Sequence, residues 1–151
     1  MTTRESIDTF LSNKEMAVAG VSRSKNKFGY QVFEMLLEKG YDAVPINPHA
    51  ETLFDKQCYA DVKALPDHIE SLLVLTPKKE SEQIVKEAVE KGIKHIWMQQ
   101  GSDTPEAINA VNGHDINLIT KKCIFMFAEP VTGVHKFHRG LMKLFGLYPR
   151  K

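Results

Sequence analysis

The segment over residues 16–29, MAVAGVSRSKNKFG, constrains the fold of this chain more than any other part of it. A short apolar run ends at Gly20, a polar stretch follows, and Gly29 opens an amphipathic run. This order predicts a buried strand, a loop and the first turn of a helix. Backbone N–H groups and the helix dipole make such a corner a site for anions. Three side chains of the loop add positive charge: Arg23, Lys25 and Lys27.

Length and composition predict one globular domain over residues 1–151. The chain is 42% hydrophobic and 26% charged, and its N-terminus, MTTRESIDTF, lacks the apolar region of a signal peptide. No apolar run approaches the roughly 20 residues that span a bilayer. Cys58 and Cys123 have no CxxC spacing, which fits a reducing compartment and gives no zinc pattern. We therefore expect a cytoplasmic protein with no membrane partner and no metal.

Apolar periodicity and turn residues predict strands that alternate with helices. The predicted strands cover residues 15–21, 41–46, 71–76, 95–98 and 116–119. The first predicted helix begins at a Thr2 or Thr3 cap and ends at about residue 11. Further helices are predicted over residues 29–38, over 78–91 and from Pro105 to about 112. A short helix is predicted over 61–65 and a final one at about 134–146. This pattern predicts an α/β, Rossmann-like, doubly wound fold, with a mainly parallel five-stranded sheet and helices on both faces. Pro45 favours an edge position or a strand end for the second strand, because proline lacks an N–H donor.

Four polar or turn-forming corners follow the predicted strands. In an open α/β sheet, ligands bind outside the carboxyl ends of the strands, so these corners are expected to line one crevice with few acids. They are 20–23 (GVSR), 47–49 (NPH), 76–78 (TPK) and 98–101 (MQQG).

The first corner departs from the patterns of two common nucleotide sites. The dinucleotide fingerprint GxGxxG needs three glycines, and only Gly20 precedes Gly29. Asn47 follows the second strand, where an Asp or Glu normally holds the ribose of NAD. The Walker pattern GxxxxGK[ST] is absent. These departures count against a standard NAD enzyme.

Taken in order, the motifs GVS…KFG, PINP, TP, WMQQG and Cys123 resemble those of the small bacterial CoA-binding proteins. These are single Rossmann-like domains, similar to the CoA-binding domain of the succinyl-CoA synthetase α subunit, and the resemblance covers about residues 10–123. In that family the first loop cradles the CoA phosphates, and the later corners shape the pocket for the adenosine part. The resemblance implies phosphate contacts from Gly20, Ser22, Arg23, Lys27 and Gly29. It implies that the rest of the pocket is lined by Asn47, Pro48, Thr76, Pro77, Gln99, Gln100 and Gly101.

The C-terminal segment is basic and lies beyond these motifs. From Lys121 to Lys151 seven Lys or Arg residues stand against one acid, Glu129, a balance of +6, so residues 1–120 carry −5 to give the overall +1. Such a segment suits an anionic ligand, and nucleic acid less well. His135 and His138 could join a metal site with Cys123 or Glu129, but surface or packing roles are commoner for such a pair.

These observations favour a protein that binds coenzyme A or an acyl-CoA non-covalently, with no catalysis of its own. Two other classes stay open. One is an enzyme that uses NAD(P) or another nucleotide, for which Cys123 is the single candidate nucleophile. The other is a regulatory module whose basic C-terminal helix contacts nucleic acid or a protein partner. A homo-oligomer is compatible with each of them.

Overall fold

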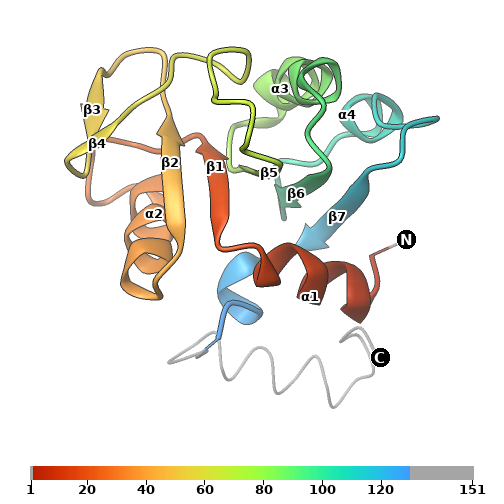
Figure 1. The fold of residues 1–151 in the computed structure, drawn as a ribbon, viewed down its shortest axis with the longest axis horizontal. Helices are drawn as coiled ribbons and strands as arrows, with labels where there is room; N and C mark the ends of the chain where they lie inside the picture. Colours follow the sequence, from red (N-terminus) through yellow and green to blue (C-terminus); the bar gives the residue numbers. More distant parts are fainter. Residues whose placement is uncertain (1, 130–151) are drawn as a thin grey trace.

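The computed structural model describes residues 2–129 and contains one five-stranded sheet, in which every pair of neighbours is parallel (Figure 1). The strand order is β2-β1-β5-β6-β7. The strands are β1 (Glu15–Ala19), β2 (Asp42–Ile46), β5 (Ser71–Val74), β6 (His95–Gln99) and β7 (Asn117–Lys122). The order reverses direction at β1, which places a topological switch point between β1 and β5.

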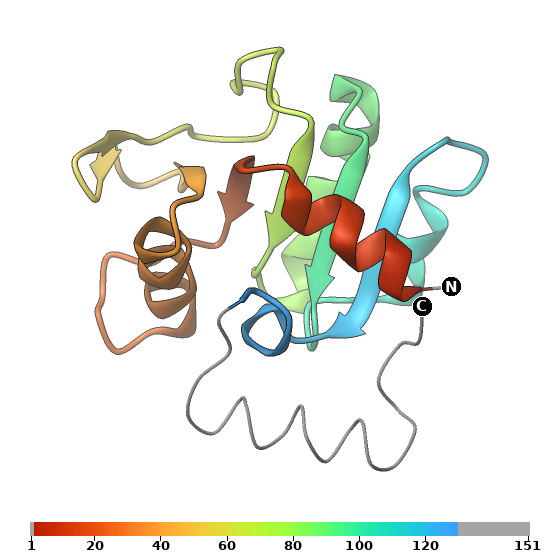
Figure 2. The same ribbon diagram turned by 60° about the horizontal axis from the view of Figure 1, so that its bottom comes forward.

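Helices cover both faces of this sheet, as the alternating pattern predicted. The helices are α1 (Arg4–Ser12), α2 (Phe28–Glu38), α3 (Lys78–Lys91) and α4 (Pro105–Asn109), and the 3-10 turn η1 covers Ile124–Met126. Figures 1 and 2 show α1, α2 and η1 on one face, with α3 and α4 on the other. The doubly wound, Rossmann-like fold is therefore confirmed.

Alternate residues of the strands supply the two halves of the core, as expected for strands buried on both faces. Val18, Leu73 and Trp97 pack toward α1 and α2, whereas Ala17 and Leu72 pack toward α3. Each of these five side chains is fully buried. The packing fixes the strand register, because a one-residue slip would exchange the two faces.

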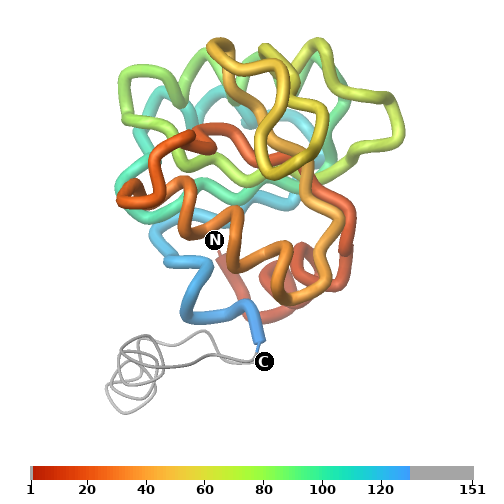
Figure 3. The backbone as a smooth tube through the Cα atoms, turned by 90° about the vertical axis from the view of Figure 1, so that its left-hand side faces the viewer, coloured from red at the N-terminus to blue at the C-terminus, as the bar shows by residue number. Residues whose placement is uncertain are grey.

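Strand β2 lies at the edge of the sheet, as Pro45 predicted. On the outer side of β2, the carbonyl oxygen of Pro45 accepts a hydrogen bond from the N–H of Tyr59, and the N–H of Asn47 donates to the carbonyl oxygen of Tyr59, both at 2.9 Å. The chain between them forms a small antiparallel hairpin, β3 (Thr52–Leu53) and β4 (Lys56–Gln57), which the sequence analysis did not predict. Figure 3 shows this hairpin, in yellow, above α2.

The short helix predicted over residues 61–65 is wrong. The structure has bends and turns there. The Asp61 carboxylate accepts from the N–H of Ala64 at 2.9 Å, and the N–H of Leu65 donates to the carbonyl oxygen of Val62. Pro66 then prevents a further helical turn. The helix predicted at about 134–146 lies outside the described residues.

Candidate functional site

A cleft of about 620 Å³ opens at the carboxyl ends of β1, β2 and β5, beside the switch point. Three of the four predicted corners meet in it, because they follow three neighbouring strands. The predicted site residues that line the cleft are Gly20, Ser22, Asn47, Pro48 and Thr76. Ala19, Ile46 and Val62 add apolar surface.

Gly20 and Gly29 bring the first turn of α2 against the end of β1. Gly20 has φ +93°, and a β-carbon on it would lie 2.9 Å from the backbone nitrogen of Thr76. A β-carbon on Gly29 would overlap the carbonyl oxygen of Gly20. Lys27, at the N-cap of α2, makes no side-chain capping hydrogen bond. The first N–H groups of a helix have no intrahelical partner, so this corner keeps donors for an anion.

The loop between β1 and α2 is ordered by its own hydrogen bonds. The Ser22 hydroxyl accepts from the N–H of Ser24, and the N–H of Lys27 donates to the carbonyl oxygen of Ser24, both at 3.0 Å. Ser22 faces the cleft, whereas Arg23 lines a neighbouring pocket with Lys25. Lys27 is exposed and lines neither space.

Asn47 joins the end of β2 to the β1–α2 loop. Its side-chain nitrogen donates to the carbonyl oxygen of Val21 at 2.9 Å, and its side-chain oxygen accepts from the N–H of His49 at 2.8 Å. A carboxylate at this position could not donate the first bond. Asn47 therefore fixes the distance between two walls of the cleft.

The third corner is partly buried under α3. The hydroxyls of Thr76 and Ser81 lie 3.4 Å apart and are buried, and Ser81 donates to the carbonyl oxygen of Pro77 at 3.3 Å. Pro77 occupies the N-cap of α3 and is exposed. The corner thus presents Thr76 to the cleft and uses Pro77 to begin the helix.

The fourth corner, residues 98–101, lies at the end of β6, and none of its residues lines the cleft. Gln99 is 5% exposed, and its side-chain oxygen accepts from the N–H of Ile124 at 3.0 Å. Gln100 is exposed, and its N–H donates to the carbonyl oxygen of Lys122 at 3.1 Å. Gly101 makes an exposed turn at φ +96°.

One wall of the cleft was missed by the sequence analysis. It comes from the loop over residues 60–62 and from one face of α3, namely Lys79, Glu80, Gln83, Ile84 and Glu87. The spacing of these α3 residues was the available signal, since positions three and four apart share a helix face. With Asp61, this wall carries three acids, so the expectation of few acids holds only for the strand-end corners.

Cys58 and Cys123 are both free thiols. Burial raises the pKa of the Cys58 thiol above its usual value, and a hydrogen bond to the Asn47 backbone offsets part of that effect. Among residues 2–129, no group of three His, Cys, Asp or Glu side chains is placed to hold a metal ion. His135 and His138 lie outside those residues. Within the same range, no helix has the length and apolar character needed to cross a membrane.

A doubly wound sheet with a cleft at its switch point, next to the glycine corner at Gly20 and Gly29, has the architecture of nucleotide-binding α/β domains. Comparison with known protein families gives a more specific assignment: the family model of the CoA binding domain matches residues 14–129. The chain belongs to this CoA-binding domain family.

Known relatives agree with this membership. The chain is 26% identical over 140 residues to the ADP-forming acetate–CoA ligase II of Archaeoglobus fulgidus, covering 90% of this chain and 21% of that one. It is 33% identical over 91 residues to the α subunit of the Pyrococcus furiosus ligase II, covering 60% of this chain and 20% of that one. The chain thus spans about a fifth of the length of these ligases.

A solved structure matches over a larger share of its length. A hypothetical protein from Pyrococcus horikoshii OT3 superposes with a TM-score of 0.79 at 29% identity, covering 87% of this chain and 94% of that one. These three relatives are archaeal, so the bacterial origin that the motif resemblance suggested stays a prediction.

Proposed function

We propose that this chain binds coenzyme A or an acyl-CoA non-covalently, in the cleft at the ends of β1, β2 and β5, without chemistry of its own. The observation that carries the proposal is the contact between Gly20 and Gly29. It holds the uncapped first turn of α2 against Gly20, which lines the cleft, and this supports pyrophosphate binding by the N–H groups of that turn. The Ser22 hydroxyl adds a donor, and Lys27 adds charge at the same turn.

The other cleft residues fit the adenosine part of such a ligand. Ile46, Pro48 and Val62 offer apolar surface for a planar base. Thr76, with its hydroxyl, and the acceptors of Glu80 and Glu87 suit ribose hydroxyls and the amino group of adenine.

We assign the fourth corner to the part of the ligand that extends out of the cleft. Gln100 and Gly101 are exposed at the carboxyl end of β6, two strands from β1. Gln99 acts there through its hydrogen bond to Ile124, which holds the segment after β7 in place. Pro77 contributes by setting where α3 begins.

A protein partner is a second element of the proposal. The Pyrococcus relative is one subunit of an acetate–CoA ligase, and this chain matches only a fifth of its length. The subunit name of that relative supports the proposal that the CoA-bound domain contacts a protein partner in the cytoplasm. The NAD(P)-enzyme alternative is weaker, because Asn47 replaces the acid that would hold an NAD ribose.

Native mass spectrometry of the protein purified from its own host tests this function. The expected result is an added mass equal to CoA or an acyl-CoA, removed by washing at high salt and restored by added CoA. The acyl mass would also name the carried group. An added mass equal to NAD, or a complex with NAD that CoA cannot displace, would contradict the proposal.

A further inference from the structure

The wall of the cleft that comes from α3 carries two polar side chains one helical turn apart. Gln83 and Glu87 both line the cleft, and the side-chain nitrogen of Gln83 donates to a carboxylate oxygen of Glu87 at 3.0 Å. Residues four apart on a helix share a face, so both side chains stand on the same side of α3. The pair lies outside the strand-end corners and is a separate part of the cleft lining.

The carboxylate of Glu87 fixes the orientation of the Gln83 amide. An ionised carboxylate can only accept hydrogen bonds, so the amide must turn its nitrogen toward Glu87 and its oxygen away. Within residues 2–129, this bond is the one hydrogen bond of the Gln83 side chain. The amide therefore keeps its oxygen and one N–H for a ligand, in a defined orientation.

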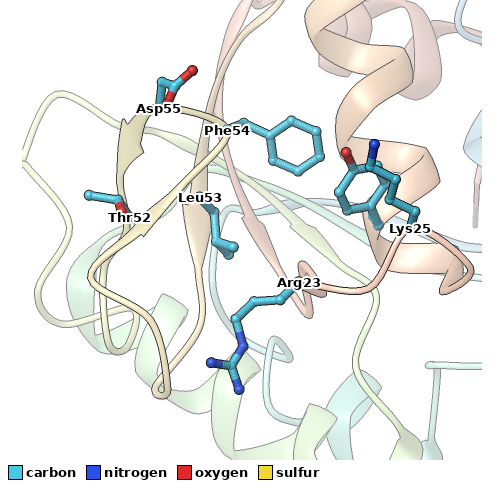
Figure 4. A pocket seen from close by; sticks show the side chains of 7 residues that line it. Arg23, Lys25, Thr52, Leu53, Phe54 and Asp55 are labelled. Atoms are coloured by element: carbon cyan, nitrogen blue, oxygen red, sulfur yellow. The ribbon is translucent and has the colours of Figure 1, made fainter.

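The two sides of the cleft differ in charge. On one side, Arg23 and Lys25 belong to the loop after β1 and lie beside the hairpin (Figure 4). The opposite wall of the cleft carries three acids and one lysine, namely Asp61, Glu80, Glu87 and Lys79. Carboxylates repel phosphates, so the uncharged part of a phosphorylated ligand is favoured beside α3.

The same wall offers apolar surface for a flat ring. Ile84 follows Gln83 in α3, and Val62 comes from the loop over residues 60–62. Ligand sites commonly combine apolar surface with a few polar groups that fix the orientation of the ligand. A Gln amide binds adenine in this way, because its oxygen accepts from the N6 amino group while its N–H donates to N7.

We infer that Gln83 and Glu87 make the cleft select a purine with an amino group at C6 over one with an oxygen there. The inference rests on the proposed function, which puts the adenine of CoA in this cleft. Gln83 contacts the base, and Glu87 is a positioning residue. A 6-oxo purine would set its O6 acceptor against the oxygen of Gln83. A flip of the amide would relieve that conflict, but it would set the Gln83 oxygen against the Glu87 carboxylate.

Calorimetric titration with CoA and with the CoA analogue in which hypoxanthine replaces adenine tests the inference. We expect the wild-type protein to bind CoA at least roughly tenfold more tightly than the analogue. In Glu87→Gln, the new amide can donate or accept, so Gln83 can flip and the preference should fall to about twofold or less. Gln83→Leu should lose the preference as well, together with affinity for CoA. The ratio of the two affinities is the readout, because the loss of one charge affects both ligands alike.

Glu82→Gln is the matched control for this ratio. It removes the same charge from the same helix, but Glu82 pairs with Lys86 at 2.6 Å and does not line the cleft. The preference for CoA should therefore stay at the wild-type value.

The remaining outcomes contradict one statement or the other. Equal affinity of the wild type for the two ligands would overturn the inference and leave the proposed function standing. An undiminished preference in Glu87→Gln, or an equal loss in Glu82→Gln, would also overturn the inference alone. Failure of the wild type to bind either ligand would overturn the proposed function.

Discussion

The side-chain amide of Asn47 donates a 2.9 Å hydrogen bond to the carbonyl oxygen of Val21, and so joins the end of β2 to the loop after β1. These two segments form neighbouring walls of the cleft. This hydrogen bond therefore adds to the pairing of β1 with β2 in holding the loop after β1 beside the end of β2.

Replacing Asn47 by Asp tests that dependence. Asp keeps the oxygen that accepts from His49 and loses the donor to Val21. Its negative charge would face the carbonyl oxygen of Val21 and repel the phosphates of the proposed ligand. We expect CoA affinity to fall at least tenfold and the free energy of unfolding to fall by about 1–3 kcal/mol. Calorimetry and urea unfolding measure the two effects. The control Asn112→Asp changes an exposed amide that bonds the side chain of Asn109, and both quantities should stay near wild type.

Gly29→Ala should disrupt the anion corner. The added β-carbon overlaps the carbonyl oxygen of Gly20, so the start of α2 must move away from β1. We expect a loss of about 1–3 kcal/mol in unfolding free energy, although alanine is the better helix former. The control Gln31→Ala lies two residues further along α2, is exposed, and should change stability by less than about 0.5 kcal/mol. If Gly29→Ala kept the stability and the CoA affinity of the wild type, the close contact between Gly29 and the carbonyl oxygen of Gly20 would be contradicted.

Asp55→Gly should stabilise the protein. Asp55 holds φ +57° in the two-residue turn between β3 and β4, a conformation that glycine adopts without steric cost. Removing the strain of positive φ should raise the unfolding free energy by about 1 kcal/mol. The greater backbone entropy of glycine in the unfolded chain offsets part of this gain. Urea unfolding measures it. A lower unfolding free energy in Asp55→Gly would show that interactions of the Asp55 side chain stabilise the protein by more than its positive φ destabilises it.

The fold was largely predictable, because its signals are local. Apolar runs predict the buried strands. Apolar spacing predicts the amphipathic α3, and Pro77 and Gly92 mark its two ends, at Lys78 and Lys91. The hairpin over residues 52–57 could not be predicted, since its turn is Phe54-Asp55 in place of a glycine-containing pair. Its stability comes from contacts with Tyr30 and Phe33, which are far away in the sequence.

The site was predictable where it depends on strand ends, and less so elsewhere. Gly20, Asn47 and Thr76 follow neighbouring strands, and parallel topology brings such positions together. The same reasoning grouped Gln99 with them, yet its side chain is buried against Ile124. Whether a side chain turns toward the cleft or into the core depends on tertiary packing, which the order of motifs does not contain.

Gln99→Leu should separate a positioning role from direct ligand contact. The substitution leaves the N–H of Ile124 without its acceptor in a buried place, at a cost of about 1–3 kcal/mol in unfolding free energy. The affinity for 3′,5′-ADP, the part of CoA that keeps the adenosine and lacks the pantetheine arm, should stay within about twofold. A larger loss of affinity for 3′,5′-ADP would place Gln99 in contact with the adenosine part.

Cys58 gives the stability a dependence on alkaline pH. The pKa of its thiol is raised in the folded protein from the usual 9.0, mainly by burial, so the folded state keeps a proton that the unfolded chain releases. The protonated thiol therefore contributes its full share to the unfolding free energy below pH 9. This contribution is lost as the pH rises through the pKa of the thiol in the folded protein. Urea unfolding at pH 8 and pH 10 should show a smaller decrease in Cys58→Ala than in the wild type. Equal decreases would contradict the role of this thiol.

Calorimetric titration of the wild-type protein with CoA, and with NAD and ATP at the same concentrations, tests whether this chain is a CoA-binding protein. We expect saturable one-to-one binding of CoA, with an affinity clearly higher than for NAD or ATP. Absence of CoA binding at millimolar concentration, or tighter binding of NAD, would contradict it.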